Sequence, residues 1–299
     1  MTKKSVFKAI VAVLVSLFCL SAIVALFRSN PQIQTETKTE TEAKTINEAV
    51  ESARGTFYLK LSGEKELTVS EEEKNTYLGG EKTRSITIEG GTINVTGGEV
   101  SVIEAANAGT LAFKNVTIKD KTENDQRVAY CNYIRFGGKL RFENCTIDSI
   151  YLKNDAQAEF INCTFISSTS QWYSVWVADG SAQFDNCKFT GYRAIKINEF
   201  EKEDVLNVSI SGCTFENISE KPGVVIGKFI TDPLNGTISV TNNKFISCQP
   251  WDQDGSIEGV DGIYESDILT SEIAFTQENN VVADAENSEA EAVLWTGFY

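Results

Sequence analysis

The sequence predicts an all-β chain that folds as a parallel β-solenoid, with one copy of a short repeat in each coil. The repeat reads apolar, any, apolar, any, Asn or Gly, small, any, apolar, as in "LRFENCTI" at 140–147, and copies recur every 18 to 30 residues. Such a period, combined with alternation of apolar and other residues on both sides of a break, is typical of a solenoid of strands. Helical repeats would place apolar residues three and four apart, and the copies do not show this spacing.

The fifth position of the repeat breaks the alternation, and only Asn and Gly occupy it. These two residue types most readily take a positive φ angle. We therefore predict a one-residue bend between two strands that both point apolar side chains into the same interior. The predicted bends are Gly90, Asn115, Asn144, Asn162, Asn186, Gly212 and Asn242, and a weaker copy occurs in "IAFTQENNVV" at 273–282.

The position after each bend calls for a small inward side chain. Cysteine occupies it four times, as Cys145, Cys163, Cys187 and Cys213, and Gly, Val or Asn occupy it in the other copies. We interpret these cysteines as free thiols that act as small hydrophobic residues rather than as a metal or redox cluster. Cys131 and Cys248 do not fit the register, and the pattern gives them no place.

Composition excludes several classes of function. The formal net charge of −15 argues against nucleic acid as a partner, because affinity for phosphates comes mainly from Lys and Arg. The chain contains no histidine, which excludes Ser-His-Asp and Cys-His catalysis and His-ligated zinc.

The first residues predict a membrane anchor. Residues 9–27 are uncharged and would span about 28 Å as a helix, which is close to the hydrocarbon thickness of a bilayer. Lysines in residues 1–8 predict a cytoplasmic tip there and export of everything after the anchor. A cleaved signal peptide is the rival interpretation, but the apolar run is long for one and no A-x-A site follows it.

Two further segments precede and open the solenoid. Residues 28–44 are rich in Thr, Glu and Lys and predict a polar stalk. Thr45 and Glu48 have the spacing of a helix capping box, so we expect a short helix that covers the first coil. The solenoid domain is then predicted over 45–283, with 284–299 as a C-terminal tail or cap.

The segment "TINEAVESARGTFYLKL" and the corners "FKNVTI", "FENCTI", "FINCTF", "FDNCKF" and "VTNNKF" resemble the right-handed parallel β-helix proteins of the pectate-lyase-like superfamily. The resemblance implies a right-handed coil with three sheets, and polysaccharide bound along the outer face of the first sheet. It also implies a stacked ladder of the corner asparagines, Asn115, Asn144, Asn162, Asn186 and Asn242. The superfamily includes lyases, hydrolases, epimerases and non-catalytic surface proteins, so it does not select an activity.

The strands before each repeat predict the ligand-binding face. "NYIRF", "IYLKN", "YSVWV" and "AIKIN" occupy equivalent places, and alternation directs every second side chain outward. Tyr and Trp offer flat surfaces to sugar rings, and Lys and Arg pair with uronate or sulfate groups. The candidate carbohydrate-binding residues are Tyr133, Arg135, Tyr151, Lys153, Trp176, Lys196 and Asn198. An ordinary mixed solvent face is the alternative interpretation of this strip.

One acidic loop is a candidate calcium site. The segment "WDQDGSIEGVDG" at 251–262 carries clustered carboxylates, which are hard oxygen ligands, but its spacing departs from that of the EF-hand loop. The candidate ligands are Asp252, Asp254, Glu258 and Asp261. A solvated loop is the alternative, so we expect no obligatory cofactor, with Ca²⁺ as the candidate ion.

Catalytic motifs of the resembled superfamily do not occur in the sequence. There is no Asp-Asp pair, no His and no Arg-x-Pro-x-x-Arg motif. The sequence therefore favours a non-catalytic, membrane-anchored and extracytoplasmic binder of acidic polysaccharide. A polysaccharide lyase that uses Arg135 or Lys153 as its base is one alternative, and a structural or adhesive surface protein is the other.

Overall fold

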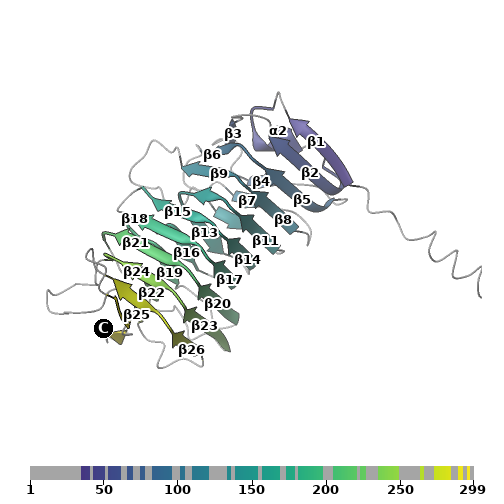
Figure 1. Ribbon diagram of the computed structural model, residues 1–299. Helices are drawn as coiled ribbons and strands as arrows, with labels where there is room; N and C mark the ends of the chain where they lie inside the picture. The colour runs from purple at the N-terminus through teal and green to yellow at the C-terminus, as the bar shows by residue number, and fades with distance from the viewer. Residues whose placement is uncertain are drawn as a thin grey trace, which may run out of the picture. The chain divides into compact units, whose positions relative to one another are not determined.

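The chain forms a parallel β-helix in which each coil adds one strand to each of three sheets (Figure 1). The computed structural model describes residues 35–40, 43–50, 53–61, 66–69, 75–77, 83–95, 102–104, 110–120, 133–135, 139–153, 157–168, 173–178, 181–197, 205–220, 223–226, 235–248, 263–265, 273–283, 289–291 and 295–296. All of these residues belong to one unit, Thr35–Tyr299.

We name the three sheets A, B and C in the order in which the chain visits them. Sheet A contains, in spatial order, β1 (Thr35–Glu40), β2 (Gly55–Leu61), β5 (Thr83–Glu89), β8 (Thr110–Lys114), β11 (Lys139–Glu143), β14 (Gln157–Ile161), β17 (Ser181–Asp185), β20 (Val205–Ser211), β23 (Asn235–Thr241) and β26 (Ile273–Glu278). Sheet B contains β3 (Glu66–Val69), β6 (Thr92–Val95), β9 (Thr117–Asp120), β12 (Thr146–Ile147), β15 (Thr164–Ser167), β18 (Lys188–Gly191), β21 (Thr214–Ile218), β24 (Lys244–Ile246), β27 (Val281–Ala283) and β28 (Glu289–Glu291). Sheet C contains β4 (Asn75–Tyr77), β7 (Val102–Glu104), β10 (Tyr133–Arg135), β13 (Ile150–Lys153), β16 (Val175–Val177), β19 (Ile195–Ile197), β22 (Val224–Ile226), β25 (Ile263–Glu265) and β29 (Trp295–Thr296).

The predicted bends between sheets A and B are confirmed. Asn115, Asn144, Asn162, Asn186 and Asn242 have φ angles of 52° to 57°, Gly90 and Gly212 also have positive φ, and so does Asn279 in the weaker copy. The backbone amide of each of these asparagines but Asn279 donates to a carbonyl at the end of the next coil's sheet A strand, as from Asn186 to Ser211 at 3.0 Å. The bend therefore turns the chain without breaking the ladder between coils.

Side chains at the bends also meet along the coils. Asn279 Nδ2 donates to Asn242 Oδ1 at 3.2 Å, which is one link of the predicted asparagine ladder. Asn186 Oδ1 lies directly against Gly212 of the following coil, where a Cβ atom would approach it to 2.5 Å. Glycine at this corner therefore leaves room for the neighbouring amide.

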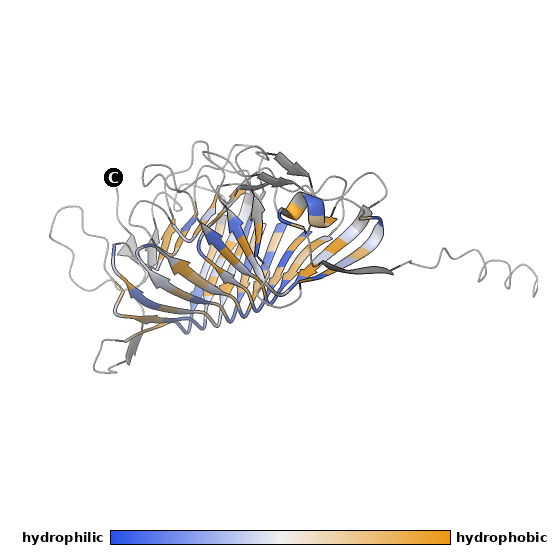
Figure 2. Cartoon of the chain, turned by 90° about the horizontal axis from the view of Figure 1, so that it is seen from above, coloured by the Kyte–Doolittle hydropathy of each residue, from blue (hydrophilic) through white to orange (hydrophobic). Residues whose placement is uncertain are grey.

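The interior is filled by two stacks of phenylalanine rings, one beneath sheet A and one beneath sheet B. Neighbouring rings in each stack have centroids 4.6 to 5.0 Å apart and are nearly parallel, and all of them are fully buried. Figure 2 shows the alternation of hydrophobic and hydrophilic residues along the strands that produces this interior. The stacks are Phe113, Phe142, Phe160 and Phe184, and Phe165, Phe189, Phe215 and Phe245.

The corner cysteines are free and buried, as predicted. The Cys187 amide donates to Cys213 Sγ at 3.4 Å, so these neighbouring cysteines of the column contact one another. The Cys163 thiol and burial raise the pKa of Cys145 far above its usual range. For Cys187 a hydrogen bond to Cys163 lowers the pKa, but the Cys213 thiol and burial outweigh it and raise the pKa to about 12. The thiols of Cys145 and Cys187 therefore remain protonated at neutral pH.

The structure also places Cys248, to which the repeat gave no role. Ser247 has a φ angle of 50° and forms a second bend after β24, so that Cys248 turns into the core and is 5% exposed. Its Sγ lies 3.5 Å from the carbonyl oxygen of Phe215. Asn217 forms a similar second bend after which Ile218 is buried. Cys131 lies outside the described residues.

Two segments before the first full coil differ in how well the sequence predicted them. The short helix α2 (Ile46–Val50) begins with the predicted capping box, in which the Glu48 amide donates to Thr45 Oγ1 at 3.2 Å and the Thr45 amide to Glu48 Oε2 at 3.3 Å. Its role as an end cap stays a prediction. Thr35–Glu40, predicted as polar stalk, instead pair in parallel with β2 as strand β1. Thr recurs at every second residue of this segment and favours strands. The prediction of a stalk considered only the polar composition and not this alternation.

Neither terminal region tests the membrane prediction. Among the described residues no helix is long and apolar enough to cross a membrane, and the predicted anchor at 9–27 lies outside them. Beyond residue 283, β28 pairs antiparallel with β27 and β29 pairs parallel with β25.

Candidate functional site

Strands of sheet C contain six of the seven residues that the sequence assigned to ligand binding. The predicted strands are β10, β13, β16 and β19, which are consecutive in the sheet. Tyr133 pairs with Tyr151, Tyr151 with Trp176, and Trp176 with Lys196, so these residues form one column across the coils. Arg135 pairs with Lys153 in the column beside it. The predicted alignment is therefore confirmed at the level of strand register.

The inward side of β13, β16 and β19 is also as predicted. Their alternate residues belong to the main core and are at most 2% exposed. They are Ile150, Leu152, Val175, Val177, Ile195 and Ile197. The outward direction of Tyr151, Trp176 and Lys196 follows from this alternation.

Outward direction does not make Tyr151 and Trp176 accessible. They are only 5% and 8% exposed, and with Ala178 they form a second hydrophobic cluster outside the main core. The two ring centroids lie 4.9 Å apart with the planes inclined at 56°. The expectation that both rings present open faces to solvent is therefore wrong. Period-two alternation predicts which side chains point out of the solenoid, but it does not predict whether those side chains are exposed to solvent.

Two cations occupy the aromatic surfaces of this face. Lys196 Nζ lies 4.1 Å from the Trp176 ring centroid and 5.9 Å from that of Tyr173, and the Arg193 guanidinium lies 5.7 Å from the Tyr173 centroid. All of these separations fall within the range of cation–π attraction. Lys196 and Arg193 are partly exposed, whereas Tyr173 and Trp176 are buried beside them.

Tyr173 and Arg193 are the residues that sequence reasoning missed. Each lies just before a strand of sheet C, where the alternation of inward and outward side chains does not apply. The sequence still placed both next to the predicted strip, because Tyr173 begins "YSVWV" and Arg193 directly precedes "AIKIN". Burial raises the pKa of Tyr173 to about 12, and the positive charge of Arg193 opposes this rise. Tyr173 is thus a neutral phenol at physiological pH.

The backbone links these residues to their neighbours on adjacent coils. The Ser174 amide donates to the Arg193 carbonyl at 3.0 Å, and the Arg193 amide donates to Ser167 Oγ at 3.2 Å. The Ser174 hydroxyl is buried and forms no hydrogen bond within the described part of the chain. A buried hydroxyl without a partner is uncommon in folded proteins.

The remaining predicted residues are placed only in part. Tyr133, Arg135 and Lys153 are located by the register of their strands, and Asn198 lies outside the described residues. The candidate calcium ligands Asp252, Asp254, Glu258 and Asp261 also lie outside them, so the site stays a prediction. The described ranges contain no group of three or more acidic or cysteine side chains arranged to hold a metal ion.

Comparison with known proteins agrees with the fold. Residues 148–294 match the family model for a right-handed β-helix region. No curated protein and no solved structure matches the chain. The strand order, the bends and this match together define a protein that contains a right-handed parallel β-helix.

Proposed function

We propose that this chain is a non-catalytic, membrane-anchored β-helix protein that binds an acidic polysaccharide on the outer side of sheet C. The observation that carries the proposal is the register of that sheet, which aligns Arg135 with Lys153 and brings Lys196 into one column with three aromatic residues. A chain molecule lying across the coils would meet a cation on several successive strands. We further propose that the protein belongs to the pectate-lyase-like superfamily, which its corner motifs resemble.

The geometry changes the roles of the residues within this proposal. Trp176 is buried and its ring face holds the Lys196 ammonium, so we assign to it the support of that cation rather than a stack on sugar. A side chain that is already ordered loses less conformational entropy when it binds a ligand. The contacts to uronate or sulfate groups are assigned to Lys196, Arg193, Arg135 and Lys153, with Tyr133 and Asn198 as flanking sugar contacts.

The absence of familiar catalytic groups from the sequence supports binding without cleavage. A chain without histidine and without an Asp-Asp pair lacks the usual acid and base of the superfamily's hydrolases. At neutral pH the Tyr173 phenol, whose pKa burial raises to about 12, stays protonated and does not act as a base. A lyase would have to take its base from Arg135 or Lys153.

Removal of the Lys196 charge tests the site. We expect Lys196→Ala to weaken binding of an oligogalacturonate about fivefold at low salt, the effect of losing one charge pair of about 1 kcal/mol. The difference from the parent should shrink as the NaCl concentration rises, because salt screens charge pairs. Titration calorimetry of the full-length chain at two salt concentrations measures both effects.

Lys188→Ala is the matched control, because Lys188 lies on sheet B and pairs with Glu216 at 2.6 Å. It removes the same charge from the chain and should leave the affinity unchanged. Equal weakening by both substitutions would show that only net charge matters and would contradict the assignment of the site. Unaltered binding by Lys196→Ala would contradict it as well.

The proposed location rests on the sequence of residues 1–44. An uncharged run at 9–27 preceded by lysines supports an anchor with the β-helix outside the cytoplasm. Protease added to intact cells should then remove the folded domain and leave a short membrane-bound stub. A mature protein whose N-terminus lies near Arg28 would instead establish a cleaved signal peptide.

A further inference from the structure

A groove lies on the outer side of sheet A, on a different sheet from the site described above. It is a hollow of about 380 Å³ that crosses β11, β14, β17, β20 and β23. Gln157, Ser181 and Asn207 line one side of it, and Gln183 and Ser209 line the other. Strand register places each set in a column that crosses the strands.

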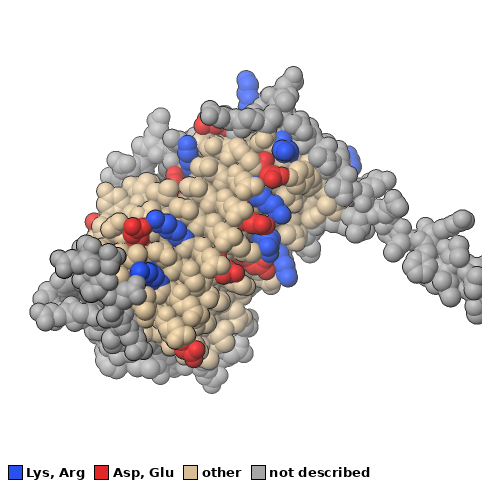
Figure 3. All heavy atoms as spheres, viewed as in Figure 1, with Lys and Arg blue, Asp and Glu red and all other residues tan. Residues whose placement is uncertain are grey.

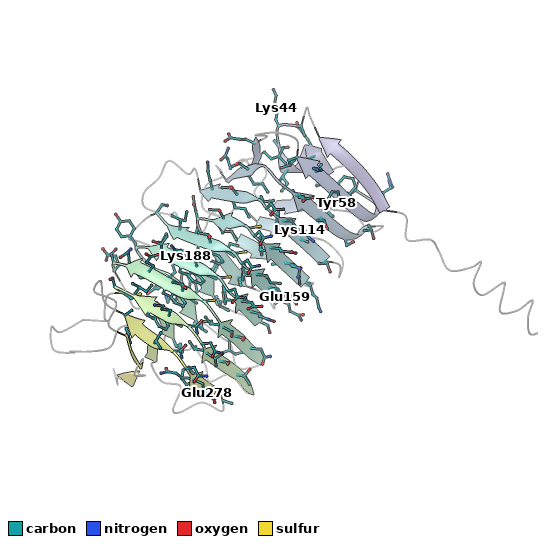
Figure 4. All side chains as sticks on the ribbon, viewed as in Figure 1. Lys44, Tyr58, Lys114, Glu159, Lys188 and Glu278 are labelled. Atoms are coloured by element: carbon teal, nitrogen blue, oxygen red, sulfur yellow. The ribbon has the colours of Figure 1, made fainter. Side chains whose placement is uncertain are left out.

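Uncharged amide and hydroxyl side chains make up most of the described lining of this groove, and the buried Ala158, Ala182 and Val208 add apolar surface between them. The strands β20 and β23 contain no charged residue, and in Figure 3 the charged side chains of sheet A gather instead over β8, β11 and β14. Among the described residues that line the groove, two are charged, Lys139 and Glu159, both at its β11–β14 end. Glu159, labelled in Figure 4, accepts a hydrogen bond from Arg141 at 2.7 Å, so much of its charge is compensated.

This lining presents hydrogen-bonding groups at the spacing of the strands. Amide and hydroxyl groups recur in each column about every 4.8 Å, and the five strands together extend about 19 Å. Thr237 Oγ1 donates to Asn207 Oδ1 at 3.1 Å, which orients that amide so that its nitrogen remains a donor. A ligand that lies along the solenoid axis would therefore meet a similar donor or acceptor in every coil.

The chemistry of the lining selects among classes of ligand. An acidic polymer or a nucleic acid would require several cations, and Lys139 is the one lysine among the lining residues that the structure describes. A protein partner would favour aromatic or other large apolar anchors, and the described part of the lining contains none. The sheet backbone beneath is already paired between strands, so it cannot bind a peptide as an added strand.

We propose that the sheet A groove binds a neutral, hydroxyl-rich glycan chain lying along the solenoid axis. Side-chain amides and hydroxyls of this kind donate to and accept from sugar hydroxyl groups without needing charge. The proposal is independent of the acidic-polysaccharide site on sheet C, because the two differ in sheet, residues and ligand charge.

The test uses two substitutions on the same strand. Ser209→Leu fills the groove and removes a hydroxyl, whereas Ser211→Leu adds the same side chain two residues further along β20, outside the lining. The probes are neutral oligosaccharides, namely glucans, mannans, xylans and galactans, titrated against the full-length chain. We expect at least one to bind the parent, with an affinity that changes less than about twofold between low and high NaCl.

For that glycan, Ser209→Leu should weaken binding about tenfold or more, and Ser211→Leu should remain within about twofold of the parent. Thermal unfolding of both variants shows whether each is folded, and a Gln183→Ala variant provides a second groove substitution if Ser209→Leu is unfolded. The proposal is overturned if no neutral glycan binds, or if groove variants and Ser211→Leu bind alike. It is also overturned if the groove substitution abolishes self-association in the absence of glycan, because a second copy of the chain would then be the occupant. Loss of the sheet C site would leave all of these results unchanged.

Discussion

Replacement of Phe184 by alanine should cost about 3 to 5 kcal/mol of the free energy of unfolding, the range expected for a large aromatic residue removed from a packed core. Phe184 is fully buried and stacks on Phe160, with centroids 4.9 Å apart and the planes inclined by only 8°. It also contacts Phe165 and Phe189 of the second stack edge-on. The cavity would therefore open between both stacks, where the strand spacing prevents collapse.

Urea unfolding followed by circular dichroism measures this loss, and Phe184→Leu serves as its control. Leucine keeps most of the apolar volume, so it should cost less than about 1.5 kcal/mol. A loss below about 1 kcal/mol for Phe184→Ala would mean that the stacked rings do not hold adjacent coils together.

Asn186→Ala has the second largest expected effect. Its φ angle of 53° costs a residue with a Cβ atom and no local polar compensation about 1 to 2 kcal/mol. Asn186→Gly keeps the left-handed bend at no such cost, so it should destabilise the chain less than Asn186→Ala. Melting temperatures of the two variants give the comparison.

Asn207→Ala is the control for loss of an amide alone, because Asn207 is exposed and lies within strand β20, where the bend requirement is absent. It should change stability by only a few tenths of a kcal/mol, about the size typical of an exposed site. If Asn186→Ala and Asn186→Gly lower the melting temperature equally, backbone conformation is not the reason for Asn at this corner.

The fold could be predicted because each coil requires particular residue types at two positions of the repeat. A bend with positive φ favours Asn or Gly, and the inward position after it favours a small residue. The sequence therefore shows where each coil bends. The weaker copy also formed a bend, at Asn279. The second bends at Asn217 and Ser247 were not predicted, because they occur in few coils and do not repeat as a pattern.

The candidate site could be predicted only as far as strand register. Alternation aligned Tyr151, Trp176 and Lys196 correctly, but the burial of the two rings depends on what lies over the sheet, which alternation does not describe. Tyr173 and Arg193 join the site from outside the strands. The sheet A groove could not be predicted from the sequence, because serine and glutamine on an outer face are also typical of an ordinary solvent-exposed surface.

Titration of the full-length chain with an oligogalacturonate, combined with ultraviolet absorbance for unsaturated uronate, tests the proposed function most directly. We predict saturable binding at low salt that weakens as salt rises, with no increase in absorbance. Product formation would contradict a non-catalytic role and identify a lyase. The absence of binding to this and every other acidic glycan would contradict the account and favour a structural role for the β-helix.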